Sequence, residues 1–194
     1  MLYNFIMSLQ KWKLLSKKDV SLSAWFPIES RTYELPDGRI IDDFTVTTLA
    51  DVAMIIPITV GNKVIVINQF KPGIGEILTQ FPAGRSEKHH KNILETAQHE
   101  LEEETGILVT ESQLHFLAKL HAFSTKGTEV IHLFLADNCD FNSQQHLDEN
   151  EEIEVIQLSF SEVDEKILTG QIWDAAGIAG WELAKKKFAN IFST

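Results

Sequence analysis

His99-Glu100-Leu101-Glu102-Glu103-Glu104-Thr105-Gly106 is the stretch of this 194-residue sequence that decides its fold and its chemistry. It closes a segment with helical periodicity, residues 92–105, whose apolar side chains Leu94, Ala97 and Leu101 fall on one stripe. Asn92 suits the N-cap of such a helix, and Gly106 suits the position just after its end. The pattern therefore predicts an amphipathic helix that ends in a dense run of acids.

Three of these acids face the same side of the predicted helix. At about 100° per residue, Glu100, Glu103 and Glu104 point together. Glu100 and Glu104 repel each other as like charges four residues apart. The last helical turn also disfavours anions, by roughly 0.3–1 kcal/mol each. A solvated charged face would carry both penalties without gain, whereas a bound divalent cation reverses them. Carboxylate oxygens suit Mg²⁺ or Mn²⁺, so we expect a metal site here.

Strands are expected before this helix. Residues 51–60 and 63–69 are apolar, β-branched runs divided by Gly61-Asn62, and they predict a hairpin buried on both faces. An earlier hairpin is expected within residues 23–47, with strands at 24–26 and 31–33 and a turn at Pro36-Asp37-Gly38. A short strand is expected to run to Phe81 and to be broken by Pro82-Ala83-Gly84.

The part of the chain after the helix continues the mixture of strands and helices. Strands are expected at 114–121, 128–136 and 153–158, and helices at 161–168 and 175–188. Residues 138–150 are polar and acidic and are expected to form a loop. One central helix, two terminal helices and no regular βαβ alternation indicate an α+β fold with a mixed sheet.

Charge and composition narrow the classes of partner. The formal net charge is -11, which disfavours a nucleic-acid partner. The single cysteine, Cys139, offers neither a disulfide framework nor a thiolate metal site, and this fits a reducing compartment such as the cytoplasm. Residues 1–15 are apolar but are interrupted by Lys11 and Lys13, and they are too short to span a bilayer. We expect a soluble protein without a membrane partner.

The helix and the segment before it resemble a known family. Pro82-Ala83-Gly84, followed after a loop by residues 99–107, is similar to the Nudix box. That box runs glycine, five residues, glutamate, seven residues, then Arg-Glu-hydrophobe-any-Glu-Glu-any-Gly-hydrophobe. Residues 68–73, 32–38 and 148–155 resemble further segments of the ADP-ribose pyrophosphatase subfamily, so the similarity covers most of residues 25–187.

The resemblance implies a fold and a reaction. The expected fold is a Nudix α/β/α sandwich around a mixed sheet, residues 48–194, preceded by an antiparallel extension, residues 1–47, that pairs subunits into a homodimer. The expected activity is Mg²⁺-dependent hydrolysis of the diphosphate of a nucleoside diphosphate derivative, with ADP-ribose giving AMP and ribose 5-phosphate. Mn²⁺ is the expected substitute metal.

The resemblance also assigns residues to roles. It implies metal ligands at the Ala83 carbonyl and at Glu100, Glu103, Glu104 and Glu151. The general base is implied at Glu149 on the acidic late loop, with Glu152 as its substitute. Substrate contacts are implied at Lys71 for phosphate, at Trp25 and Phe44 for the adenine, and at the loop residue Gly127. A solvated loop at 148–154 and a core packing role for the two aromatics are the plainer alternatives.

Four departures from the box concern residues that orient the ligands. His99 replaces the box arginine, and as a shorter side chain without a fork it is expected to orient Glu103 more weakly. Counted back from the helix, the position of the first box glutamate is occupied by Lys91. Counted forward from Gly84, the loop is one residue longer than in the box. Gln80 stands where a glutamate commonly precedes Pro-Ala-Gly. Two alternatives therefore stay open: a nucleotide-sugar diphosphatase acting, for example, on a GDP-sugar, and a catalytically weak nucleotide-binding module.

Overall fold

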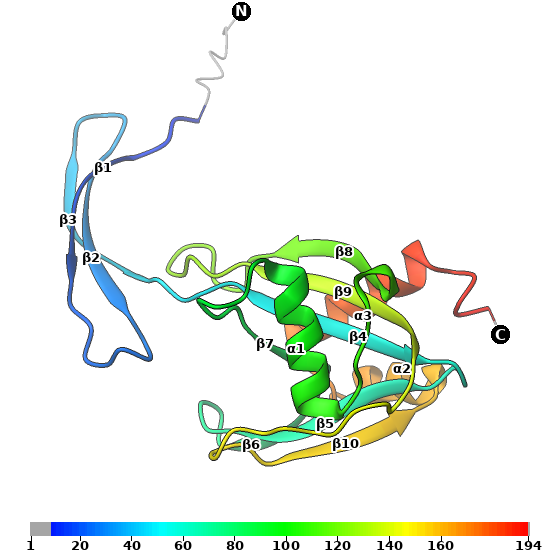
Figure 1. The fold of residues 1–194 in the computed structure, drawn as a ribbon. Helices are drawn as coiled ribbons and strands as arrows, with labels where there is room; N and C mark the ends of the chain where they lie inside the picture. Colours follow the sequence, from blue (N-terminus) through cyan, green and yellow to red (C-terminus); the bar gives the residue numbers. More distant parts are fainter. Residues whose placement is uncertain (1–8, 194) are drawn as a thin grey trace, which may run out of the picture. The chain divides into compact units, whose positions relative to one another are not determined.

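The computed structural model describes residues 9–193, which form two compact units (Figure 1). Of the described residues, the first unit contains 9–49 together with Phe123–Thr128. The second unit contains Ala50–Ala122 and residues 129–193. The short loop Phe123–Thr128 therefore joins the N-terminal segment, although it lies between two strands of the second unit in the sequence.

The first unit is a three-stranded antiparallel sheet in the order β1-β2-β3. Its strands are β1 (Lys13–Asp19), β2 (Ile28–Glu34) and β3 (Ile40–Thr47). The turn predicted between the last two strands is present, with Gly38 at a φ of 85°, which glycine adopts without strain. Thr47 and Gly127 form a parallel bridge that ties the loop Phe123–Thr128 to the end of β3.

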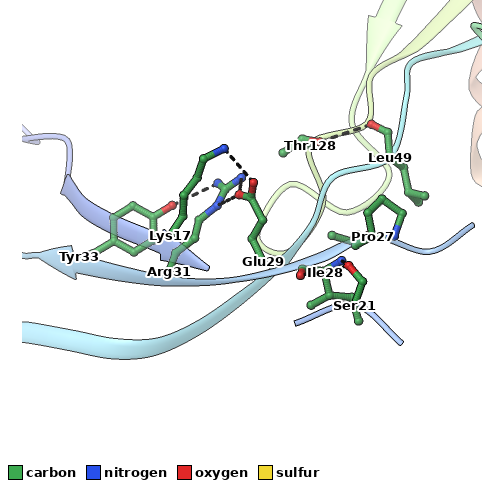
Figure 2. Close-up of polar contacts among 10 residues, drawn as sticks. Lys17, Ser21, Pro27, Ile28, Glu29, Arg31, Tyr33, Leu49 and Thr128 are labelled. Atoms are coloured by element: carbon green, nitrogen blue, oxygen red, sulfur yellow. Dashed lines mark hydrogen bonds and ion pairs between the residues drawn. The ribbon is translucent and has the colours of Figure 1, made fainter. Parts of the chain in front are cut away.

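The expected strand at residues 24–26 is wrong, because these residues lie in the turn region between β1 and β2. Ser21 organises this connection: its backbone N–H donates to Asp19, and its hydroxyl accepts the N–H of Ile28 at 2.8 Å (Figure 2). The strand resumes after Pro27, which lacks an N–H for a ladder bond. The apolar pattern of Ala24-Trp25-Phe26 resembled a strand, but side chain to backbone bonds decided the local structure.

A charged network lies across β1 and β2, as Figure 2 shows. The carboxylate of Glu29 accepts from Lys17 Nζ at 2.8 Å and from Arg31 Nε at 2.8 Å. Arg31 also donates to the hydroxyl of Tyr33 at 3.3 Å. The side chains of Glu29 and Arg31 are each only 17% exposed, so this pair stabilises the sheet more than a fully exposed ion pair would.

The second unit is built on a seven-stranded mixed sheet. Its main path is β10-β5-β4-β9-β8, with β6 added to β5 and β7 added to β4. Only β4 and β9 pair in parallel among the described strands, and the remaining pairs are antiparallel. The strands are β4 (Val52–Thr59), β5 (Val64–Lys71), β6 (Glu76–Gln80), β7 (Ala83–Arg85), β8 (Leu114–Leu120), β9 (Ile131–Cys139) and β10 (Ile153–Leu158).

Helices cover both faces of this sheet, as Figure 1 shows. Helix α1 (Ile93–Thr105) packs on one face, with Ala97 and Leu101 in a cluster that includes Ile55. Helices α2 (Phe160–Leu168) and α3 (Ala175–Lys187) pack on the other, where Trp181 is fully buried. This arrangement confirms the predicted α+β sandwich around a mixed sheet, with one central and two terminal helices.

The expected hairpin of residues 51–69 forms only at its tip. Strands β4 and β5 pair at Ile58 and Val64, next to the turn. Farther from the turn, β7 adds to β4 and β6 adds to β5, while β9 pairs along β4 and β10 along β5. Pro82 bridges the diverging strands, since its carbonyl accepts the N–H of Ile55 at 2.9 Å. The segment Pro82-Ala83-Gly84 therefore starts a new short strand after the break that the sequence predicted.

Candidate active site

The acidic helix α1 begins and ends at the predicted residues. The side chain of Asn92 accepts the N–H groups of Leu94 and Glu95 at 2.9 and 3.0 Å. Gly106 has a φ of 73°, and its N–H donates to the carbonyl of Glu102 at 2.7 Å. With both ends fixed by caps, the last turn presents its glutamates at a defined place against β7.

Glu104 is a buried acid, only 4% exposed. Its Oε2 accepts the backbone N–H of Ala83 at 2.9 Å, so the last helical turn is bonded to the start of β7. Burial, followed by the charge of Glu100, raises the pKa of Glu104 to about 8, while the Ala83 N–H and Lys71 act in the opposite direction. A carboxyl group in this environment gains from a nearby cation.

Glu100 packs directly on Gly84. An ideal Cβ built on Gly84 would lie 2.0 Å from Oε2 of Glu100, a distance that no side chain can occupy. Glycine is therefore needed here for the close approach of the acid. Burial, followed by the charges of Glu103 and Glu151, raises the pKa of Glu100 to about 8. Glu103 is exposed at the edge of the same turn.

The late acidic loop brings one of its predicted residues to this cluster. The charge of Glu151 raises the pKa of both Glu100 and Glu104, and Asp148 acts on Glu100 as well. A turn joins these two loop residues, with the Glu151 N–H donating to the Asp148 carbonyl at 3.0 Å. Glu149 is exposed on the same loop.

Lys71 is the cation of this region. Its Nζ donates to Oε1 of Gln69, and burial lowers its pKa against the opposing charges of Glu104, Glu151 and Asp174. The predicted phosphate contact is thus brought to the predicted metal-binding acids. Sequence reasoning missed Asp174, whose only signal was its fitness as a helix N-cap.

The donor set suits a divalent cation. Several carboxylates share the region with one lysine, and two of them are held with strongly raised pKa values by burial and mutual repulsion. Within residues 9–193, no three acids or histidines are yet gathered closely enough to hold an ion as they stand. The acids are therefore electrostatic neighbours rather than a formed set of metal ligands.

The sequence profile of the NUDIX domain matches residues 48–179. The chain belongs to the Nudix family. It is 28% identical to the ADP-ribose pyrophosphatase of Bacillus subtilis (strain 168) over 167 residues, which cover 84% of this chain and 86% of that protein. It is 31% identical to the methanol dehydrogenase activator of Bacillus methanolicus over 143 residues, or 73% and 75% of the two chains.

A solved structure described as an ADP compounds hydrolase shares the fold. It superposes with a TM-score of 0.81 at 22% identity and covers 94% of this chain and 97% of its own. That structure shows the shared fold, and the family match and the sequence relative indicate a Nudix pyrophosphohydrolase related to ADP-ribose pyrophosphatase. The family generally uses divalent metals and acts on small nucleoside diphosphate derivatives. No helix among the described residues is long and apolar enough to cross a membrane.

Two of the residues that depart from the Nudix box, Lys91 and His99, lie just before and on α1, whereas Gln80 ends β6. The ring of His99 stacks on His90, with centroids 5.0 Å apart and an interplanar angle of 15°. Within the described chain, no hydrogen bond or ion pair joins His99 to Glu103. Lys91 pairs with Glu95 at 3.4 Å, one turn farther along the helix. The orienting role of His99 in this Nudix hydrolase stays a prediction.

The remaining predicted substrate residues belong to the first compact unit. Trp25 is 89% exposed in the turn between β1 and β2. Phe44 packs edge-on against Trp12 and Tyr33, and the ammonium of Lys126 lies 3.6 Å from its ring centroid. Since the lysine occupies one face of Phe44, Trp25 has the freer ring. Gly127 donates its N–H to the Phe123 carbonyl at 2.7 Å, which defines the loop's conformation.

Cys139 takes no part in this site. Its thiol is buried at the end of β9, and burial raises its pKa to about 12. A nucleophilic cysteine needs a lowered pKa and access to its substrate. A buried thiol with a raised pKa therefore does not suit nucleophilic catalysis.

Proposed function

We propose that this Nudix hydrolase splits the diphosphate of ADP-ribose into AMP and ribose 5-phosphate in a Mg²⁺-dependent reaction. The observation that carries the proposal is the position of half-buried Glu100 and buried Glu104 against the Ala83-Gly84 strand, within the electrostatic reach of Lys71. Buried acids with raised pKa values beside a single lysine suit a site that receives a metal ion and a phosphate chain together. The relation to an ADP-ribose pyrophosphatase supports the choice of substrate.

Each residue of the cluster has a part in the proposed reaction. Glu100, Glu104 and Glu151, with Glu103 and the Ala83 carbonyl, would hold the ion. When bound, Mg²⁺ offsets the negative charge of the diphosphate and acidifies water. Lys71 binds a phosphate oxygen, and its ammonium offsets part of the charge that develops there. These residues together lower the repulsion that a diphosphate presents to an attacking oxygen.

The water-activating residue is proposed on the late loop. Glu149 accepts a proton as the water oxygen bonds to one phosphorus and the bridging P–O bond breaks. The electron pair of that bond stays on the departing phosphate. Glu149 is exposed, so it is free to reach a bound substrate, and Glu152 on the same loop is its substitute. Trp25 stacks on the adenine, as its 89% exposed ring allows.

The first compact unit is proposed to pair two subunits into a homodimer. Strand β1 is exposed along its whole length in one chain, and Leu14 and Leu15 are 46% and 45% exposed. Trp12, directly before this strand, is 45% exposed. Apolar side chains of this size on an exposed sheet favour burial against another protein surface. Light scattering of the full chain tests this proposal, because a homodimer has twice the mass of one chain.

A substrate panel tests the proposed function. Product formation is measured with Mg²⁺ for ADP-ribose, GDP-mannose, a dinucleoside polyphosphate and a nucleoside triphosphate. We expect the highest kcat/KM for ADP-ribose, with AMP and ribose 5-phosphate as products. A clear preference for GDP-mannose would replace the substrate with a nucleotide sugar. If the wild type turned over none of these compounds faster than a Glu104→Gln variant does, the protein would be a nucleotide-binding module rather than an enzyme.

A further inference from the structure

The Lys71 ammonium is hydrogen-bonded to Gln69 and lies in the field of nearby carboxylates. Three carboxylates act on the Lys71 ammonium: Glu104, Glu151 and Asp174. The first two are proposed metal ligands, so a bound Mg²⁺ cancels their attraction for the lysine and adds repulsion of its own. Asp174 lies on a different element and is not a proposed ligand. It is the counter-ion that keeps its charge when the metal site is filled.

Asp174 uses only one of its two carboxylate oxygens to cap helix α3. As the N-cap of α3, its Oδ1 accepts the N–H of Gly177 at 2.6 Å. Its Oδ2 is buried and has no hydrogen-bond partner within the described chain. A Cβ at Gly177 would lie 2.4 Å from this oxygen, so the glycine makes room for it. A buried carboxylate oxygen without a partner is costly, and a nearby cation reduces that cost.

A second group fixes Lys71 from its own strand. Gln69 lies two residues before Lys71 and on the same face of β5. Its Oε1 accepts the Lys71 ammonium and also the Nε2 of Gln80, at 3.4 Å for the latter. Gln80 is buried on the paired strand β6. The amide of Gln80 thus steadies Gln69, which directs the lysine from one side.

We propose that Asp174 is a positioning residue for Lys71, which it holds together with Gln69 as the diphosphate-binding cation once Mg²⁺ has occupied the acids of α1. This inference rests on the proposed function, in which Lys71 contacts a phosphate oxygen. It also explains why a helix cap uses a carboxylate at a site already rich in acids. A neutral cap would serve the helix equally well but would leave Lys71 without a counter-ion in the loaded site.

The substitution Asp174→Asn separates the charge from the cap. Asparagine caps helices as well as aspartate does, so the bond to Gly177 is kept while the counter-ion is lost. The measurement is the Kd of α,β-methylene-ADP-ribose, which resists hydrolysis, by calorimetry in excess Mg²⁺. We expect D174N to weaken binding about tenfold, the size of one charge-assisted hydrogen bond. In steady-state assays, KM should rise more than kcat falls.

A double-mutant cycle shows whether the effect passes through Lys71. In a Lys71→Met background, D174N should weaken binding no further, because no ammonium is left to position. Glu76→Gln is the matched control, since Glu76 lies opposite Lys71 in the β5–β6 ladder but is exposed. We expect its Kd to equal that of the wild type. Unchanged Kd in D174N, or an equal loss in both backgrounds, would overturn the proposal.

Two further measurements separate this proposal from others. Asp174→Ser keeps a capping hydroxyl and should lose as much ligand affinity as D174N. If affinity fell only in variants whose Tm is also lower, the cause would be damage to α3, and the proposal would be overturned. Inorganic pyrophosphate in excess Mg²⁺ serves as a second ligand without a nucleoside. A tenfold loss of affinity for pyrophosphate in D174N would support the positioning role of Asp174. If the wild type bound pyrophosphate but not the ADP-ribose analogue, only the proposed substrate would be rejected.

Discussion

The carboxylate of Glu100 occupies the space that a side chain at position 84 would need, since a Cβ on Gly84 would lie 2.0 Å from Glu100 Oε2. This contact ties the Pro-Ala-Gly segment to the acidic helix turn. Both segments belong to the Nudix box, and the fold makes each depend on the other.

Gly84→Ala should therefore damage the site more than the fold. The new methyl group displaces Glu100 from its position, and a shift of about 1 Å in a catalytic group can cost about 10²-fold in rate. We expect kcat/KM for ADP-ribose to fall by about that factor. Gly73→Ala is the control, because nothing lies within 4 Å of a Cβ at Gly73. Equal activity of both variants would show that the Gly84 contact does not position the acid.

The stability of the metal-free protein should fall as the pH rises. The pKa of Glu100 and of Glu104 is raised from 4.5 to about 8 in the folded protein. Each group therefore stabilises the fold fully below about pH 4.5, its unfolded-state value, and loses this contribution as the pH rises through about 8. Thermal unfolding without metal should show a decreasing Tm from about pH 6 to about pH 8.5.

Mg²⁺ should reverse this loss, because it binds the deprotonated acids. The rise in Tm on adding Mg²⁺ should be larger at about pH 8.5 than at about pH 6. Ca²⁺ provides a comparison ion with the same charge. A Mg²⁺ effect that is equal at both values would contradict the assignment of these two glutamates as ligands.

Glu104→Gln should stabilise the metal-free protein at about pH 8 while removing its metal response. The amide oxygen of glutamine can still accept the Ala83 N–H, and the buried charge is gone. We expect a higher Tm than in the wild type without metal, and no rise on adding Mg²⁺. Glu102→Gln is a control on the same turn, since Glu102 accepts from Ser143 rather than from the site. A lower Tm in E104Q would mean that its carboxylate serves the fold.

Trp25→Ala should weaken substrate binding without changing stability. The ring is 89% exposed, so its removal costs the fold little, whereas stacking on a base contributes about 1–3 kcal/mol. We expect KM for ADP-ribose to rise about tenfold or more. Leu22→Ala, at a fully exposed residue of the same connection, is the control. An unchanged KM in W25A would remove this residue from the substrate site.

His99→Arg restores the side chain that the Nudix box has at this position. A guanidinium is longer and can form paired bonds to a carboxylate, so it can reach Glu103 where the imidazole stacks on His90. We expect kcat to rise by about the few-fold that one exposed charge-assisted contact provides. Identical rates and pH profiles for both proteins would show that residue 99 does not orient Glu103.

Much of the fold followed from local patterns in the sequence. Asn92 and Gly106 bounded α1 correctly, because capping depends on residues next to the helix. Trp25 was placed in a strand because its neighbours are apolar, whereas bonds from Ser21 and the following proline formed a turn. The divergence of β4 from β5 depends on partners that are distant in sequence, which a hairpin pattern cannot reveal.

The candidate site could be predicted from the sequence where its acids are close together in the chain, but not where they are distant in the chain and close only in the fold. Glu100 and Glu104 were found from their repulsion and from the helix dipole. Asp174 lies far along the chain from the box, and its sequence context indicated only a helix cap. The pairing of Gln69 with Gln80 arises from the register of β5 and β6, which the sequence did not specify.

The central claim is that Glu100 and Glu104 at the end of α1 bind Mg²⁺ for the hydrolysis of a diphosphate. It is tested most directly by the release of AMP and ribose 5-phosphate from ADP-ribose while Mg²⁺ is titrated into the wild type and E104Q. The wild type should turn over only with metal, and E104Q should be slower by about 10²-fold or more at saturating Mg²⁺. Equal rates in the two proteins, or full activity of the wild type in a chelator, would contradict the claim.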